Sequence, residues 1–401
     1  MADRKVLVIS SWAPPLIEGS PSIMDNLLRF FTPDSYIILT RNELYSNKKR
    51  NADWLPVNYY FYGQKRQEKV KAIATPVAKS VTPIDMLRKK FNYFVTPFME
   101  IWSIIKVGSS VIKIEKPTSI LGLSEGGPMI STLFLSLFYR LPYSIFIMDL
   151  YADNLITSWS VKVIANFFEP IIFKNAKHLI VLNEGVKEFY EKKHSVSAEV
   201  VRNAFTGSIK EDNQFIKNDK FKIVFTGSIY WAQEEALLRL VKVVNKLPDV
   251  KLLIYTPQSK AQLETIGIKE KNNINISWVA PDKIGEVLST ADALFLPLSF
   301  NTVAPNLINT SVPAKFASYL VSGAPILVHA PRESFISKHC EKYEAGLVVS
   351  NPDENELKSA IIKLMKSREY CGNLVRHAKG LSKINYGLKE NAEKLRRLLY
   401  E

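Results

Sequence analysis

The stretch PAKFASYLVSGAPILV, residues 313–328, predicts a short helix followed by a buried strand. Pro313 suits the first turn of a helix, and Gly323 suits the position just past its end. The apolar run after Gly323 is typical of a strand that is covered on both faces, as in a parallel sheet. A helix that leads directly into such a strand is the repeating unit of an α/β fold.

Similar apolar runs recur on both sides of this stretch, with amphipathic segments between them. They lie at residues 5–10, 36–39, 119–123, 143–148 and 178–182 in the first half, and at 221–225, 251–255, 274–278, 293–297, 325–328 and 346–349 in the second. The polar segment GSIKEDNQFIKNDK, residues 207–220, separates the two series. We therefore expect an α/β protein of two Rossmann-like, doubly wound domains, residues 1–205 and 206–385, followed by a final helix within residues 386–401.

The bulk properties are those of a globular protein with a strongly positive charge. Of 401 residues, 47% are hydrophobic and 23% are charged, and the formal net charge is +14. Such a charge indicates an anionic partner, which could be nucleic acid, an acidic membrane surface or a phosphorylated small molecule. Cys340 and Cys371 form no CxxC pair, and no secretory hydrophobic segment follows residues 1–4, so we expect a reduced, cytoplasmic setting.

In open α/β sheets, ligands bind beyond the carboxyl ends of the strands, so the residues just after each apolar run are candidate site residues. The loop after the first run contains Glu18, Gly19 and Ser20. The glycine lets the backbone approach a ligand, and the helix that follows offers N–H groups to an anion. A plain connecting loop explains these residues equally well.

Two acidic residues follow later strands of the first half. Glu125 lies in SEGGP, residues 124–128, and Asp149 begins DLYAD, residues 149–153. Carboxylates at the ends of two parallel strands can converge on one cleft, where one would act as a base or stabilise a positive centre. The alternative is that they cap the helices that follow. We favour the catalytic interpretation.

The second half offers a glycine loop of its own. Gly227 and Ser228 follow the strand at residues 221–225 and precede a helix that we expect to begin near Ala232. A Gly-Ser turn between a strand and a helix can cradle a phosphate group. The residue types alone would also suit an ordinary turn.

The opening stretch contains a second candidate for anion binding. A helix that begins at Pro313 places Lys315 and Ser318 together, opposite a buried stripe of apolar side chains. A lysine beside the free N–H groups of a helix start would attract a diphosphate. The commoner alternative is a lysine that faces water.

These segments, in this order, resemble the GT-B glycosyltransferases of family 4, the nucleotide-sugar-dependent enzymes of bacterial surface polysaccharide synthesis. VPAKFASYLVSGAPILV, residues 312–328, is similar to the family segment P-S-K-x-x-E-Y-L-x-x-G-x-P-I. STADALFLPL (289–298) and EAGLVVSNPDENELKSAI (344–361) support the resemblance. In the first half, MDLYAD (148–153) resembles a D-L-W-P-D segment, and NAKHLIVLNEGVKEFY (175–190) with VVRNAF (200–205) resembles the approach to the interdomain linker.

The resemblance implies two Rossmann-like domains that face each other, with the final helix crossing back to the first. The first domain would bind a glycan or polyprenyl diphosphate-linked acceptor, and the second would bind the nucleotide-sugar. Transfer of a hexosyl group, usually with retention, would need no metal and no cofactor, because a helix N-terminus and basic residues neutralise the leaving diphosphate. The implied site residues are Asp149 and Glu125 for catalysis; Gly19, Ser20, Gly227, Ser228, Lys315, Ser318 and Pro313 for the donor and its phosphates; and Glu18, Tyr151 and Asp153 on the acceptor side.

The chain departs from the family pattern at several positions. The Arg and Lys that commonly follow the strand at Phe225 are replaced by Ser-Ile-Tyr-Trp and then Gln233. The glutamate that usually holds the nucleotide ribose is replaced by Ser318, and the position eight residues earlier, acidic in many members, is Thr310. A histidine that often precedes the aspartate is replaced by Met148. These departures motivate a different class of function, a degenerate family member that binds a partner or a membrane without catalysis. A GT-B epimerase or phosphorylase is a further enzymatic alternative.

Residues 64–106 carry nine basic and three acidic residues, interleaved with aromatic ones. This pattern suits a helix that rests on an anionic membrane at the inner face of the plasma membrane, although a solvated helix with an ordinary buried face would look similar. Nucleic acid is the weakest candidate partner, because the basic residues are dispersed and no nucleic-acid-binding motif is present.

Overall fold

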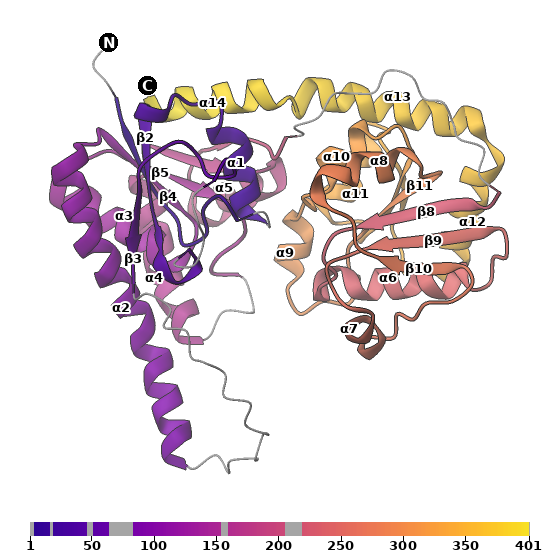
Figure 1. Cartoon of the computed structure of the whole chain (residues 1–401), viewed down its shortest axis with the longest axis horizontal. Coiled ribbons are helices and arrows are strands. Elements are labelled where there is room, and N and C mark those ends of the chain that lie inside the picture. The colour runs from indigo at the N-terminus through magenta and orange to yellow at the C-terminus, as the bar shows by residue number, and fades with distance from the viewer. Residues whose placement is uncertain are drawn as a thin grey trace. The chain divides into compact units, whose positions relative to one another are not determined.

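The computed structural model describes residues 4–16, 19–45, 51–63, 83–153, 159–204 and 219–400, without the side chains of residues 83–95 and 159–161. The chain divides into two compact units. The first comprises Met1–Leu182, Lys187–Val201 and Lys389–Glu401, and the second comprises Asn183–Val186 and Arg202–Leu388. Each unit contains one parallel sheet with helices around it (Figure 1), so the expected pair of doubly wound α/β domains is confirmed.

The sheet of the first unit has the strand order β3-β2-β1-β4-β5-β6-β7, and all neighbours are parallel. The strands are β1 (Val6–Ile9), β2 (Tyr36–Arg41), β3 (Tyr59–Tyr62), β4 (Ser119–Leu123), β5 (Tyr143–Ile147), β6 (His178–Val181) and β7 (Ala198–Val200). The helices are α1 (Ser20–Leu28), α2 (Pro83–Glu115), α3 (Gly126–Tyr139), α4 (Trp159–Asn175), and all but the first residues of α5 (Glu184–His194) and α14 (Leu388–Tyr400). The strand order reverses between β1 and β4, and such a reversal is where open α/β sheets bind ligands.

The sheet of the second unit has the order β10-β9-β8-β11-β12-β13, also with parallel neighbours. The strands are β8 (Phe221–Thr226), β9 (Val250–Tyr255), β10 (Ile274–Ser277), β11 (Ala293–Pro297), β12 (Ile326–His329) and β13 (Leu347–Val349). The helices are α6 (Trp231–Val244), α7 (Lys260–Thr265), α8 (Ile284–Ser289), α9 (Pro305–Thr310), α10 (Phe316–Val321), α11 (Phe335–Lys342), α12 (Glu354–Lys366) and α13 (Arg368–Asn385). Here the order reverses between β8 and β11.

Strand β8 shows why the inner strands of this sheet contain runs of apolar residues. Ile223 and Phe225 belong to one apolar core, whereas Val224, between them, belongs to another. Successive side chains of a strand point to opposite faces, so the two cores cover the two faces of the sheet. A strand covered on both faces does not alternate apolar and polar residues. The apolar run at residues 223–225 in the sequence agrees with this.

Helix α14 belongs to the first unit, although it follows the second unit in the sequence (Figure 1). The hydroxyl of Tyr400 donates a hydrogen bond to the carbonyl of Ser35 (2.7 Å), just before β2. The ring of Tyr400 also lies 6.0 Å from that of Phe31. Lys394 forms an ion pair with Glu199 of β7 (2.9 Å). These contacts fasten α14 to the first unit at two different places.

Candidate active site

A cavity of about 410 Å³ lies in the first unit beyond the carboxyl ends of β1, β4 and β5. It is lined by Ser11, Trp12, Arg41, Pro97, Glu100, Ile101, Ser124, Glu125, Gly126, Gly127, Ile130, Asp149, Leu150, Tyr151 and Ile164. Both expected carboxylates, Glu125 and Asp149, are therefore in one cavity. The position of the cavity follows from the reversal of strand order between β1 and β4.

Glu125 occupies the N-cap position of α3, but its side chain makes no capping hydrogen bond. Its carboxylate instead accepts hydrogen bonds from the backbone N–H of Ser11 and from the hydroxyl of Ser10 (3.1 Å), both at the end of β1. Burial raises the pKa of Glu125 to about 7, although the bonds from Ser11 and Ser10 favour the ionised form. A carboxyl group that titrates near neutral pH in a cavity can exchange a proton with a bound molecule.

Asp149 follows β5 and forms another part of the cavity wall. Its side chain keeps an exposed surface. The protein atoms around the carboxyl group still displace enough water to raise the pKa of Asp149 to about 6. The Ser124 hydroxyl donates a hydrogen bond to the backbone carbonyl of Asp149 (3.4 Å), which ties this residue to the end of β4.

The two glycines after Glu125 allow side chains to approach the start of α3 closely. A Cβ atom at Gly126 would collide with the hydroxyl of Tyr151, and one at Gly127 would lie 2.8 Å from Cδ of Glu100. Tyr151, an expected acceptor-side residue, therefore packs directly on this helix start, inside the cavity wall. Burial raises the pKa of Tyr151 to about 12, so its hydroxyl stays protonated at neutral pH.

Glu100 of α2 is a cavity residue that sequence reasoning missed. Its carboxylate accepts hydrogen bonds from the guanidinium of Arg41, from the Tyr62 hydroxyl (3.1 Å) and from the Ser11 hydroxyl (3.3 Å). Arg41 and Tyr62 are the last residues of β2 and β3, so the rule that ligands bind after strands could have pointed to Arg41. Glu100 lies inside a long helix and gives no local signal.

Three other expected residues of the first unit do not line the cavity. Asp153 instead forms an ion pair with Lys193 (2.6 Å). Gly19 precedes α1 with a φ of +62°, and neither Gly19 nor Ser20 is among the residues that line the cavity. Glu18 lies outside the described residues.

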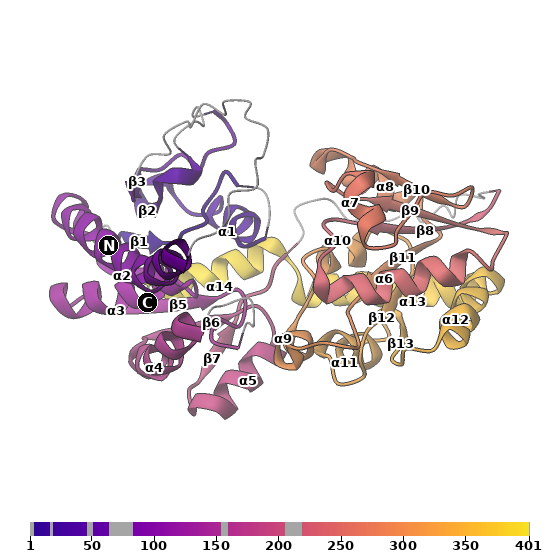
Figure 2. The same ribbon diagram turned by 90° about the horizontal axis from the view of Figure 1, so that it is seen from below.

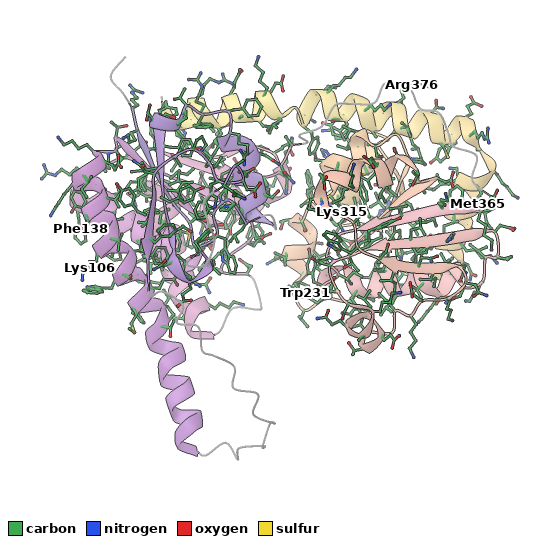
Figure 3. All side chains as sticks on the ribbon, viewed as in Figure 1. Lys106, Phe138, Trp231, Lys315, Met365 and Arg376 are labelled. Atoms are coloured by element: carbon green, nitrogen blue, oxygen red, sulfur yellow. The ribbon has the colours of Figure 1, made fainter. Side chains whose placement is uncertain are left out.

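In the second unit, Lys315, which is labelled in Figure 3, lies against the loop after β8. Gly227 has a φ of +98°, and a Cβ atom at this position would lie 3.5 Å from both Cε and Nζ of Lys315. The Nζ atom lies 3.7 Å from the centre of the Phe225 ring and donates a hydrogen bond to Oε1 of Gln233 (3.3 Å). Burial lowers the pKa of Lys315 well below its ordinary value, and no carboxylate of the described residues forms an ion pair with it to offset this effect. An anion bound here would supply the missing negative charge.

Helix α10 is shorter than the sequence predicted. It begins at Phe316 and has six residues, whereas a start at Pro313 was expected. The first α-helical hydrogen bond joins the Tyr319 N–H to the Lys315 carbonyl (3.0 Å), and the Phe316 N–H bonds to the Pro313 carbonyl (2.9 Å) in a tight turn. So short a helix offers little dipole, and the candidate anion site depends on the ammonium of Lys315 rather than on the helix start.

Ser318 and Ser228 are placed differently around this lysine. The Ser318 hydroxyl donates a hydrogen bond to the carbonyl of Lys315 (2.8 Å), so it stabilises the turn in which the lysine sits. Ser228 follows Gly227 and is exposed. Tyr319, which sequence reasoning missed, places its hydroxyl 3.1 Å from the N–H of Thr226 and accepts a hydrogen bond from it, which fixes the end of β8.

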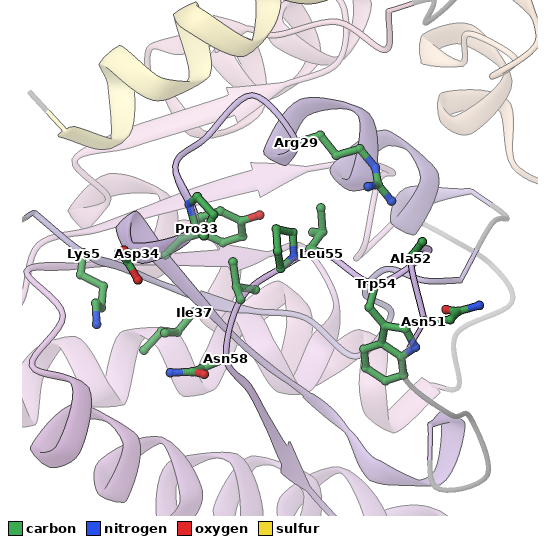
Figure 4. Close-up of a pocket in the computed structure, with 13 residues that line it drawn as sticks. Lys5, Arg29, Pro33, Asp34, Ile37, Asn51, Ala52, Trp54, Leu55 and Asn58 are labelled. Carbon is green, nitrogen blue, oxygen red and sulfur yellow. The ribbon is translucent and has the colours of Figure 1, made fainter.

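A second cavity, of about 570 Å³, lies at the amino ends of β1, β2 and β3 (Figure 4). Its two basic residues, Lys5 and Arg29, form ion pairs with Glu115 (2.9 Å) and Asp25 (2.8 Å). The cations of this cavity are thus already neutralised by carboxylates, unlike Lys315. Across the part of the chain with described placement, no group of three or more His, Cys, Asp or Glu residues is arranged to hold a metal ion.

Residues 220–367 match the family model described as Glycosyl transferases group 1. No curated protein matches the chain in sequence. Among solved structures, a glycosyltransferase from Rickettsia africae ESF-5 is similar with a TM-score of 0.65 and 11% identity, over 100% of this chain and 98% of that chain. HepE from Anabaena, in complex with UDP and glucose, gives a TM-score of 0.63 and 10% identity over 99% of both chains.

CalG4, the calicheamicin glycosyltransferase, gives a TM-score of 0.54 and 11% identity over 100% of this chain and 99% of that chain. At such identities the similarity shows the fold alone. The fold is that of the GT-B glycosyltransferase structures, with two Rossmann-like parallel-sheet domains.

Proposed function

We propose that this protein is a glycosyltransferase that moves a hexosyl group from a nucleotide-sugar to a glycan or lipid-linked acceptor in bacterial polysaccharide synthesis, at the cytoplasmic side of the membrane. One observation carries the proposal. Within the unit that contains the match to glycosyl transferases group 1, a lysine without a carboxylate partner among the described residues lies against the glycine loop that follows β8. This is the arrangement that a leaving diphosphate would need.

Lys315 would hold the diphosphate of the donor. Because Gly227 has no side chain, phosphate oxygens can approach the backbone of the loop and the Nζ atom of Lys315 together. A charge-assisted bond from the ammonium stabilises the negative charge that grows on the diphosphate as the sugar leaves. Binding and transfer should therefore proceed in EDTA, with no metal and no cofactor.

The cavity of the first unit would bind the acceptor. Glu125, whose pKa is about 7, is suited to take the proton of an acceptor hydroxyl, and ionised Asp149 is suited to stabilise a positive sugar centre. Retention of the anomeric configuration is the outcome that the resemblance implies. The NMR signal of the anomeric proton in the isolated product distinguishes retention from inversion.

A thermal-shift screen in EDTA tests the donor site. UDP, GDP, dTDP, ADP and CMP are compared, each with its common sugar conjugates, and one nucleotide should raise the melting temperature selectively. A ligand at 100 times its Kd stabilises by about 2.7 kcal/mol. Lys315→Met, which keeps the apolar stem and removes the charge, should lose most of this shift.

Lys363→Met is the matched control, because Lys363 of the same unit also lies over an aromatic ring, at 3.9 Å from the centre of Tyr370. This variant should respond to nucleotides as the unmodified protein does. Equal responses of the Lys315→Met and Lys363→Met variants would contradict the assignment of Lys315.

A non-catalytic binding protein is the second candidate, and a specific observation favours it. The side chains at the two positions where the family often has acidic residues are engaged locally: Ser318 bonds to the Lys315 carbonyl (2.8 Å) and Thr310 to the Asn306 carbonyl (2.9 Å). If no nucleotide or nucleotide-sugar stabilises the protein at millimolar concentration, the transferase proposal fails and this candidate replaces it.

A further inference from the structure

The outer surface of α2, α3 and α4 in the first unit exposes large apolar side chains. Those of Met99, Trp102, Leu137, Phe138 and Phe167 are each 63–65% exposed. The three helices follow one another along one side of the unit (Figure 2). We call this surface, defined by these five residues, the apolar face.

Contacts between the helices make the apolar face continuous. The Ser131 hydroxyl of α3 donates a hydrogen bond to the Ile101 carbonyl of α2 (3.2 Å). Between α3 and α4, the ring of Phe134 lies 6.0 Å from that of Phe168, and Phe134 also stacks on Phe138 (6.3 Å). Phe168 in turn contacts Phe167 (5.1 Å). Phe138 of α3 and Phe167 of α4 are therefore joined through one chain of packed aromatic rings.

Within residues 96–116, 126–142 and 162–177 of these helices and their ends, all exposed charged side chains are basic. The exposed cations are Lys106, Lys113, Lys116, Arg140, Lys174 and Lys177. The three acidic residues of the same segments point inward. Glu100 pairs with Arg41, Glu115 with Lys5 (2.9 Å), and the fully buried Glu169 with Lys193 (2.8 Å).

We propose that the apolar face rests on the surface of an anionic lipid bilayer. Exposed aromatic and aliphatic side chains enter the boundary between head groups and acyl chains, while the surrounding cations attract acidic head groups. Lys106 and Trp102, whose Nζ atom and ring centre lie 5.3 Å apart, combine both features on one helix, and Figure 3 labels Lys106 and Phe138 at the same outer edge of the unit. A second copy of the chain is a poor occupant, because it would bring like charges together.

The protein would lie on the bilayer rather than span it. No helix within the described part of the chain is long and apolar enough to cross a membrane. Helix α2 carries residues of both sites: Pro97 and Ile101 line the acceptor cavity, whereas the exposed Met99 and Trp102 belong to the apolar face. In a step that rests on the proposed function, a lipid-linked acceptor could pass its head group into the cavity while its chain stays in the bilayer.

Vesicle co-sedimentation of the full chain, without nucleotide, tests the proposal. Vesicles of 70% phosphatidylcholine and 30% phosphatidylglycerol should bind the protein at low salt, and pure phosphatidylcholine vesicles should bind it at least about tenfold more weakly. Raising the salt to about 1 M should reduce binding to the anionic vesicles, because the Debye length falls to about 3 Å. Absence of binding to the anionic vesicles at low salt would overturn the proposal.

Two variants and two controls locate the surface. Trp102→Ser with Phe138→Ser, and Lys106→Glu with Lys113→Glu, should each lower the partition coefficient about tenfold or more. Trp278→Ser, at an equally exposed tryptophan of the second unit (66%), and Lys269→Glu should leave it unchanged. Unchanged binding of both double variants would overturn the proposal, as would light scattering that shows a dimer which the Trp102→Ser, Phe138→Ser variant abolishes.

Melting temperatures within a few degrees of the unmodified protein confirm that the variants are folded, because these side chains are exposed. The Lys315→Met variant should bind vesicles normally. The thermal-shift screen therefore tests the proposed donor site, and vesicle co-sedimentation tests the proposed membrane surface independently of it.

Discussion

The Nζ atom of Lys315 lies 3.7 Å from the centre of the Phe225 ring and against Gly227, where a Cβ atom would lie 3.5 Å from it. Burial lowers the pKa of Lys315 well below its ordinary value, because a desolvated cation has no compensating charge. The negative face of the Phe225 ring stabilises the charged ammonium to some extent. The negative charge of a bound diphosphate would stabilise it much more.

Nucleotide binding should therefore be coupled to proton uptake. A bound diphosphate raises the pKa of Lys315 again, so the complex holds a proton that part of the free protein has lost. Affinity should fall as the pH rises from the lowered pKa of the free protein to the restored pKa of the complex. Calorimetry in two buffers of different ionisation enthalpy measures this uptake, which Lys315→Met should abolish and Lys363→Met should keep.

The two carboxylates of the acceptor cavity, Glu125 and Asp149, should determine how the rate of transfer depends on pH. Glu125 and Asp149 have pKa values of about 7 and 6, and both act in the ionised form in the proposed reaction. The rate should fall on the acidic side through this range. Glu125→Gln and Asp149→Asn should each lower kcat by about 10²-fold or more. A Glu125→Gln variant with full activity and an unchanged pH profile would show that Glu125 takes no part in the reaction.

The Glu125→Gln substitution should also change the free energy of unfolding, by an amount that depends on pH. The pKa of Glu125 is about 7 in the folded protein, compared with an ordinary value of 4.5. The folded protein therefore holds this proton more tightly than the unfolded chain does, and ionisation costs stability fully above pH 7 and not at all well below pH 4.5.

Glu125→Gln should then be more stable than the unmodified protein at pH 8, by on the order of 2 kcal/mol, and should lose this advantage at pH 5. Melting curves at the two pH values compare the proteins. A Glu125→Gln variant that is equally destabilised at both pH values would show that packing, not ionisation, dominates at this position.

The contact between Gly126 and Tyr151 predicts a pair of coupled substitutions. Gly126→Ala should displace the Tyr151 ring, because the added methyl group would occupy the place of the hydroxyl, and acceptor KM should rise with the displacement of this cavity wall. Adding Tyr151→Phe should partly restore the loss. Gly372→Ala, at a helical glycine with open space around it, is the control and should be neutral or stabilising by up to about 1 kcal/mol. Additive effects of Gly126→Ala and Tyr151→Phe would contradict the contact.

The sequence predicted the inner strands of both sheets and the edge strands β10 and β13 of the second sheet. The edge strands β3 and β7 of the first sheet were missed: Tyr60 and Phe61 of β3 remain partly exposed, and β7 has only three residues with Glu199 in the middle. The strand-end rule found Glu125 and Asp149 because nearness to the cavity is fixed by their position after a strand.

Residues placed by tertiary contacts could not be found in this way. Glu100 reaches the cavity only because α2 packs beside α3, and its partners Arg41 and Tyr62 are distant in sequence. The start of α10 was predicted too early, because proline is equally suited to the tight turn that ends at Phe316. The proposed role of Lys315 is unaffected by this correction, because the proposal depends on the charge of the lysine and not on the length of the helix.

The most direct test of the donor site is a calorimetric titration, in EDTA, of the nucleoside diphosphate selected by the thermal-shift screen into the unmodified protein and into Lys315→Met. The account predicts saturable binding by the unmodified protein and an affinity about 10- to 100-fold lower for the variant, as expected for loss of a charge-assisted bond to phosphate. Equal affinities, or binding that appears only when a divalent metal is added, would contradict it.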